Sequence, residues 1–256
     1  MDMYYKVEGR GETVVFIHGL SDNLTYWEFL AANLKDTHQI LRFDLPGHGQ
    51  SELTDDVTRT SYVEDLKKLL DELNIKKAHM VGFSLGGAVA IDFTVRYQDY
   101  VTSLVVMSGF SKCDDYLKDI LNQFKAALNV SFEEFYNLIL PKVLCPDVIK
   151  SNKVELDLLR QTASQTADTE AYIKAVDVCL SFDIDEELSD INVPTLILAG
   201  KYDEISRLSL ERKLQGKIKN SRLIVFDNVK HNLLVGGNNH EILDILMEFL
   251  KKERGK

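Results

Sequence analysis

The stretch from Ala78 to Tyr97, "AHMVGFSLGGAVAIDFTVRY", predicts a buried strand, a sharp turn and a helix. The largely apolar "AHMVGF" is typical of a strand and "LGGAVAIDFTVRY" of a helix, which leaves Ser84 in the turn between them. Gly82 lies two residues before this serine and Gly86 two residues after it. A serine on such a turn projects its oxygen beyond the sheet, and the strained backbone tolerates little side-chain bulk nearby. The pattern therefore favours Ser84 as a nucleophile, with a serine that only caps the helix as the alternative.

The rest of the chain alternates between short apolar runs and amphipathic segments. The runs expected to form strands are 14–17, 39–43, 78–83, 103–107, 195–199 and 223–226, with a further short strand near 3–7. Most are apolar throughout, which is typical of parallel strands covered on both faces. A helix is expected within "TSYVEDLKKLLDELNI", with Ser61 and Glu64 as a capping-box pair, and another near the C-terminus before "KKERGK". The alternation predicts an α/β fold with a mostly parallel, doubly wound sheet.

One segment interrupts this alternation. Residues 112–187 show helical patterning without a clear strand, punctuated by Pro141 and Pro146. We therefore expect residues 1–111 and 188–256 to form the α/β core and residues 112–187 to form an inserted helical cap. Open α/β sheets bind ligands at their carboxyl edge, so the cap is expected to sit there. Its apolar residues, Val154 and Leu158 among them, are expected to pack onto the core or to line a pocket.

Composition limits the classes of function. The 256 residues are 45% hydrophobic and 27% charged, as in ordinary globular proteins, and the net charge of −10 argues against binding nucleic acid or an anionic membrane surface. Cys113, Cys145 and Cys179 form no CxxC motif and are expected to be reduced, and none of the six histidines has a metal-binding spacing. We expect no metal, no cofactor, no signal peptide and no membrane span, and hence a cytoplasmic protein that acts on a small molecule.

A serine nucleophile requires a base, and the base requires an acid that orients it. In a sheet of this kind both should follow later strands, the acid before the histidine. Asp203 in "TLILAGKYDEIS" follows one predicted strand, and His231 in "RLIVFDNVKHNLL" follows the last one. The sequence therefore predicts a triad of Ser84, His231 and Asp203. The alternative acids are Asp227, four residues before the histidine, and the pair that follows the strand at 103–107, Asp114 and Asp115.

The reaction also requires two main-chain amides that bind the developing oxyanion. One is expected from Leu85, which follows the nucleophile. The other is expected from Leu20 in "FIHGL", in the loop after the strand at 14–17. We interpret His18 as a residue that holds this loop, and His48 as one that shapes the turn in "DLPGHGQS".

Together these motifs resemble those of the α/β-hydrolase superfamily, and specifically its smaller members with a helical cap. The matching stretches are "FIHGLSDNLTYW", "LRFDLPGHGQS", "VGFSLGG", "VPTLILAGKYD" and the histidine of "NVKHNLL", in order over essentially the whole chain. The resemblance implies that Ser84 is the nucleophile, His231 the general base and acid, and Asp203 its orienter. It also assigns the oxyanion hole to the amides of Leu20 and Leu85.

The chain departs from the family pattern at two positions close to the histidine. Lys230 stands where the family commonly has glycine, and Gly236 stands five residues after the histidine, where the family often has an acidic residue. Both departures concern how the loop that carries His231 is held.

The resemblance implies hydrolysis of a carboxylic ester, thioester or lactone of a small to medium, fairly apolar substrate through an acyl-enzyme. The serine argues against haloalkane dehalogenases and epoxide hydrolases, which resemble this scaffold but use aspartate at that place. A second hypothesis is an enol-lactonase, a carbon–carbon hydrolase or a related lyase. Substrates of these enzymes are often anionic and would require a fixed cation in the pocket. Arg160 is the only arginine of the predicted cap. A third hypothesis is a ligand-sensing protein with little turnover.

Overall fold

A seven-stranded sheet forms the centre of the molecule in the computed structural model, which describes residues 3–253. The strand order is β1-β3-β2-β4-β5-β6-β7, and every neighbouring pair is parallel except β1 and β3. The predicted mostly parallel α/β fold is confirmed, and the strand expected near 3–7 is β1. The strands are β1 (Tyr5–Gly9), β2 (Glu12–Ile17), β3 (His38–Phe43), β4 (Ala78–Phe83), β5 (Val101–Met107), β6 (Thr195–Gly200) and β7 (Ser221–Phe226).

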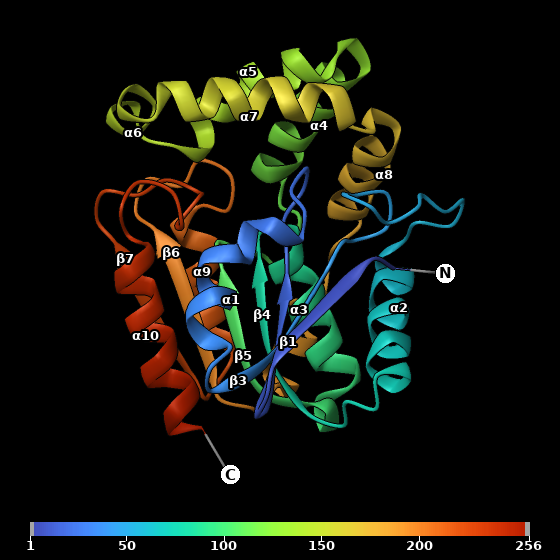
Figure 1. Cartoon of the computed structure of the whole chain (residues 1–256), viewed down its shortest axis with the longest axis vertical. Helices are drawn as coiled ribbons and strands as arrows, with labels where there is room; N and C mark the ends of the chain where they lie inside the picture. Colours follow the sequence, from blue (N-terminus) through green and yellow to red (C-terminus); the bar gives the residue numbers. More distant parts are fainter. Residues whose placement is uncertain (1–2, 254–256) are drawn as a thin grey trace.

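Helices cover both faces of the sheet (Figure 1). Side chains of β2 alternate between the faces: Val14 and Phe16 join one apolar cluster, Val15 and Ile17 the other, and all four are 0% exposed. Since both faces are buried, residues 14–17 of this strand are all apolar rather than alternating. The first cluster includes α1 (Glu28–Leu34) and α10 (Asn239–Lys252), and the second includes α2 (Arg59–Glu72), α3 (Leu85–Arg96) and α9 (Leu208–Lys217).

The start of α2 and the end of α10 test two sequence predictions about helix ends. The capping box of α2 consists of Thr58 and Ser61, with Ser61 N donating to Thr58 Oγ1 at 3.0 Å and Thr58 N donating to Ser61 Oγ at 2.8 Å. The predicted pair of Ser61 and Glu64 is therefore wrong, because the extended backbone of Thr58 starts the helix one turn earlier. At the C-terminus, the last turn of α10 carries Lys251 and Lys252, and the rest of the "KKERGK" stretch beyond Glu253 lies outside the described residues.

Between β5 and β6 the chain forms five α-helices, which gather beyond one end of the sheet (Figure 1), and a short 3-10 helix at Glu187–Asp190. Pro141 does not end α5 but lies within its last turn. The expectation that Val154 and Leu158 are packed is wrong, because they are 78% and 63% exposed and Leu156 is the buried residue of α7. The helices are α4 (Asp115–Val130), α5 (Phe132–Val143), α6 (Pro146–Ser151), α7 (Lys153–Thr166) and α8 (Thr169–Leu180).

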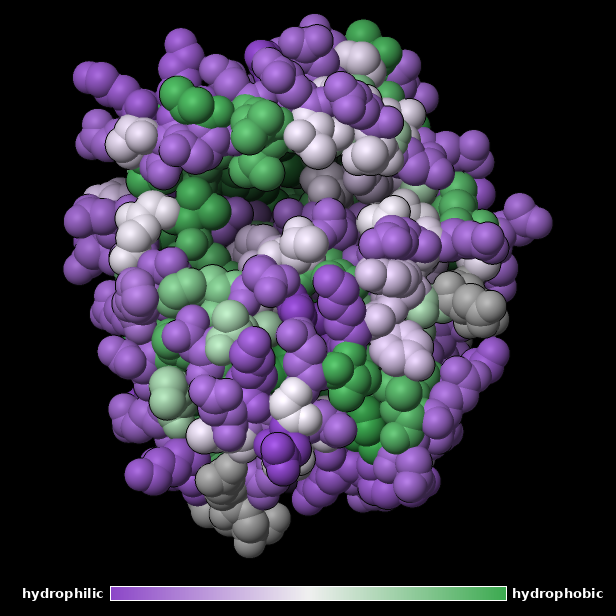
Figure 2. Space-filling view, in the orientation of Figure 1, coloured by the Kyte–Doolittle hydropathy of each residue, from purple (hydrophilic) through white to green (hydrophobic). Residues whose placement is uncertain are grey.

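The surface reflects this layering. A recess bordered by apolar side chains lies beneath the uppermost helices, and most of the remaining face is hydrophilic (Figure 2). Among residues 3–253, no helix combines the length and the apolar character that a membrane span requires.

Candidate active site

Ser84 lies on a strained turn between β4 and α3. Its φ of 52° and ψ of −117° are unusual for a residue with a side chain, and such strain is tolerated only where the surroundings enforce it. The surroundings explain the flanking glycines: a β-carbon at Gly82 would lie 2.2 Å from the carbonyl oxygen of Gly86, and one at Gly86 would lie 2.2 Å from that of Ile17. The Ser84 side chain makes no capping hydrogen bond to α3, so the alternative of a helix-capping serine is wrong.

The hydroxyl of Ser84 instead contacts a histidine. His231 Nε2 lies 2.8 Å from Ser84 Oγ, and His231 Nδ1 lies 2.7 Å from Asp203 Oδ2. The second carboxylate oxygen of Asp203 accepts a hydrogen bond from the main-chain N–H of Ile205 at 2.7 Å. An ionised carboxylate requires the proton on Nδ1, which leaves the Nε2 lone pair directed at the serine. The fold thus brings together three residues that stand far apart in the sequence.

The alternative acids do not contact the histidine. The Asp227 side chain is 78% exposed and pairs with Lys201 at 2.8 Å. Asp114 accepts from the main-chain N–H of Leu117 at 2.9 Å and pairs with Arg207 at 2.7 Å, while Asp115 is an exposed residue in the first turn of α4. Asp203 is the carboxylate hydrogen-bonded to His231.

The loop after β2 is held by His18, as the sequence predicts. The main-chain N–H of Leu45 donates to His18 Nε2 at 2.9 Å, so Nδ1 carries the ring proton and donates to the carbonyl oxygen of Gly19 at 2.8 Å. Burial lowers the pKa of His18 to about 4, partly opposed by the bond to Gly19. The imidazole is therefore neutral near pH 7 and bridges the main chain of Gly19, the residue before Leu20, to that of Leu45.

The two predicted oxyanion donors follow neighbouring strands. Strands β2 and β4 are adjacent, with Ile17 paired to Gly82, so the loops that follow them meet at the carboxyl edge of the sheet. Leu85 is the first residue of α3 and its N–H lacks an intrahelical acceptor. The roles of Leu20 and Leu85 remain predictions.

Two buried residues that support the site were missed in the sequence. Asp44, after β3, accepts from the main-chain N–H groups of Leu24 at 2.6 Å and Gln50 at 2.9 Å, which ties two loops together. Ser108, after β5, has a φ of 49° and donates its hydroxyl to the carbonyl oxygen of His231 at 2.8 Å. Both residues directly follow a strand at the carboxyl edge of the sheet, and this position in the sequence could have identified them.

Two further carboxyl groups lie close to the triad. Burial raises the pKa of the half-buried Asp22 to about 7, and the nearby His231 offsets part of this effect. Burial also raises the pKa of Glu211 well above its usual range, and the negative charge of Asp203 adds to the rise. No sequence pattern distinguished these two residues from ordinary surface acids.

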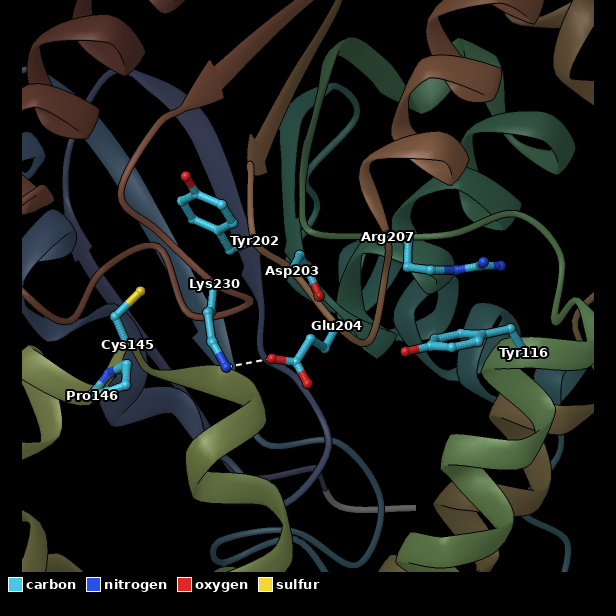
Figure 3. Close-up of a pocket in the computed structure, with 8 residues that line it drawn as sticks. All are labelled: Tyr116, Cys145, Pro146, Tyr202, Asp203, Glu204, Arg207 and Lys230. Carbon is cyan, nitrogen blue, oxygen red and sulfur yellow. Dashed lines mark hydrogen bonds and ion pairs between the residues drawn. The ribbon is translucent and has the colours of Figure 1, made fainter.

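A cavity of about 500 Å³ has Asp203 in its lining, but neither Ser84 nor His231. Figure 3 shows the side chains around it. Arg207 stacks over the Tyr116 ring with 4.0 Å between its guanidinium carbon and the ring centroid. Within residues 3–253 no group of three or more His, Cys, Asp or Glu side chains is arranged to hold a metal ion. The cavity is lined by Tyr116, Cys145, Pro146, Tyr202, Asp203, Glu204, Arg207 and Lys230.

Most of the chain is similar in sequence to known proteins. RutD of Azorhizobium caulinodans, provisionally named a carbamate hydrolase, is 26% identical over 231 residues, which cover 88% of this chain and 86% of RutD. The pimeloyl-(acyl-carrier protein) methyl ester esterase of Vibrio cholerae is 26% identical over 243 residues, covering 90% and 91% of the two chains.

Solved structures agree in fold. The crystal structure of MGS-M2, an alpha/beta hydrolase from a Medee basin deep-sea metagenome library, superposes with a TM-score of 0.92 at 24% identity, covering 98% of this chain and 94% of that one. The sequence model described as alpha/beta hydrolase fold matches residues 12–237. The chain belongs to the alpha/beta hydrolase family.

Proposed function

We propose that this protein is a serine hydrolase that cleaves a carboxylic ester, thioester or lactone through an acyl-enzyme, with residues 112–187 as its cap. One observation carries the proposal: an unbroken line of hydrogen bonds runs from Asp203 through His231 to Ser84, with distances of 2.7 Å and 2.8 Å. The similarity to the methyl ester esterase of Vibrio cholerae supports an ester-type substrate.

The proposed reaction uses the triad and the two predicted oxyanion donors. Ser84 Oγ attacks the substrate carbonyl while His231 Nε2 takes its proton, and Asp203 stabilises the resulting imidazolium. The main-chain N–H groups of Leu20 and Leu85 bind the oxyanion of the tetrahedral intermediate. His231 then protonates the departing alcohol, and afterwards takes a proton from the water that attacks the acyl-enzyme. The bond between the acyl carbon and Ser84 Oγ breaks, His231 returns the proton to Oγ, and the acid is released.

Apolar surroundings favour a neutral, fairly apolar substrate. The Phe83 ring lies 5.1 Å from the His231 ring and stacks on Tyr26 with 4.7 Å between ring centroids. Arg160, the candidate cation for an anionic substrate, already lies 3.4 Å from Glu133 and 3.7 Å from Asp157. A guanidinium with two carboxylate partners is a poor anchor for an anionic lactone, so the esterase proposal is favoured over that alternative.

The test combines turnover with active-site labelling. p-Nitrophenyl esters of increasing acyl length should be hydrolysed over many turnovers, and a fluorophosphonate should label wild type but not Ser84→Ala. A ligand-sensing protein would instead show a single slow event together with a ligand-dependent rise in melting temperature. Absence of both turnover and labelling in the folded protein would overturn the proposal.

A further inference from the structure

Lys230 connects three segments next to the triad. It directly precedes His231, its side chain is 16% exposed, and its ammonium forms an ion pair with Glu204, the residue after Asp203 (Figure 3). The same ammonium donates to the carbonyl oxygen of Pro141, in the last turn of α5, at 2.7 Å. The Lys230 side chain thus contacts both the loop that carries Asp203 and the predicted cap, while Lys230 itself lies in the loop that carries His231.

Further hydrogen bonds join the cap to the histidine loop on both sides of Lys230. The main-chain N–H of Asn232 donates to the carbonyl oxygen of Val143 at 3.0 Å. The thiol of Cys145 lies 3.5 Å from the carbonyl oxygen of Asn228. The end of α5 and the residues around His231 therefore form one connected unit.

We propose that Lys230 is a positioning residue that sets the spacing between Asp203 and His231 and couples it to the seating of the end of α5. The proposal rests on the proposed function of the triad. An ammonium has three donors and no acceptor, so it can satisfy Glu204 and Pro141 simultaneously, which the glycine common in the family cannot. Water is partly excluded from this ion pair, because the Lys230 side chain is 16% exposed and that of Glu204 is 45% exposed. Displacement of catalytic groups by about 1 Å can cost about 100-fold in rate.

The molecule contains a matched comparison. Lys201 and Asp227 lie 2.8 Å apart and bridge the same two loops, after β6 and β7, but their side chains are 48% and 78% exposed. Exposed pairs of this kind contribute little to stability. Lys201→Met therefore removes a lysine between the same loops and leaves the link to the cap in place.

The decisive experiment compares Lys230→Met, Glu204→Gln and their double variant with Lys201→Met, on a neutral p-nitrophenyl ester. Lys230→Met should lower kcat/KM about 10-fold through displacement of the triad, mainly in kcat. Lys201→Met should change it less than about two-fold. Melting temperatures and circular dichroism spectra establish that each variant is folded.

The pH profile separates positioning from general stability. The charged and titratable groups around His231 are Asp203 after β6, Asp22 after β2, and Lys230 with its partner Glu204. The acid limb of kcat/KM reports protonation of the catalytic base. The acid limb should move to higher pH in Lys230→Met, which removes a positive charge, and to lower pH in Glu204→Gln, which removes a negative one, by about 0.3–0.5 units each. In the double variant it should return to the wild-type position.

Amide hydrogen exchange tests the coupling without relying on turnover. The Asn232 amide, bonded to Val143, should exchange at least about 10-fold faster in Lys230→Met and at the wild-type rate in Lys201→Met. Unchanged exchange with unchanged kcat/KM would overturn the positioning role of Lys230, as would shifts of both acid limbs in one direction. Faster exchange in a protein that never turns over would support the coupling and contradict the proposed function alone.

Discussion

The carboxyl edge of the sheet and the exposed helix α7 differ in how tightly their side chains are fixed. At the edge, Asp203 accepts a hydrogen bond from the main-chain N–H of Ile205, and the carbonyl oxygen of His231 accepts one from the Ser108 hydroxyl, so hydrogen bonds between side chains and main chain hold these residues. On α7, Leu158 and Leu159 are 63% and 60% exposed. The contrast indicates that the proposed chemistry depends on the sheet edge and that the outer layer tolerates change.

The largest expected effect follows from removing a charge at the edge. Asp203→Asn keeps the shape of the side chain but removes the carboxylate that fixes the tautomer of His231, so kcat should fall by about 10⁴. Asp227→Asn, at the rejected acid, should change kcat less than about two-fold. Steady-state kinetics on one ester measure both, and equal losses would contradict the assignment of the acid.

The next effect concerns stability of the turn that carries Ser84. Gly86→Ala places a β-carbon 2.2 Å from the carbonyl oxygen of Ile17, which the backbone cannot move away from cheaply, so unfolding free energy should fall by about 3 kcal/mol or more. Gly216→Ala, on α9 with nothing within 4 Å, should raise it by about 0.5–1 kcal/mol. Urea denaturation measures both, and a stable Gly86→Ala variant would contradict the crowding.

A smaller effect depends on pH. The folded pKa of Asp22, about 7, lies above its ordinary value of 3.8, so the folded state retains this proton and loses stability as the pH rises through that interval. Asp22→Asn cannot ionise, and its melting temperature relative to wild type should rise between pH 5 and pH 8. An equal difference at both pH values would show that Asp22 does not titrate in this interval.

The smallest effect is expected on α7. Leu158→Ser should change the unfolding free energy by less than about 0.5 kcal/mol, because the side chain is 63% exposed. The matched change Leu156→Ser, at the buried position of the same helix, should cost about 2 kcal/mol or more. A large loss for Leu158→Ser in melting experiments would show that another surface covers α7.

The sheet and the line of Ser84, His231 and Asp203 could be predicted because each of these residues follows an apolar strand, a local pattern with one spatial meaning. Asp44 and Ser108 also follow strands, but their partners come from distant loops, and pairing across loops has no sequence signal. The exposure of Val154 and Leu158 was not predictable either, because a helical apolar stripe does not reveal whether another element covers it.

We expect Ser84 to become acylated during turnover. A reaction with a p-nitrophenyl ester, quenched with acid in the first turnover and digested, should yield one acyl adduct by mass spectrometry. The adduct is predicted on the peptide that carries Ser84, and it should be absent from Ser84→Ala. An adduct on another residue, or steady turnover by Ser84→Ala at the wild-type rate, would contradict the role of Ser84 as the nucleophile.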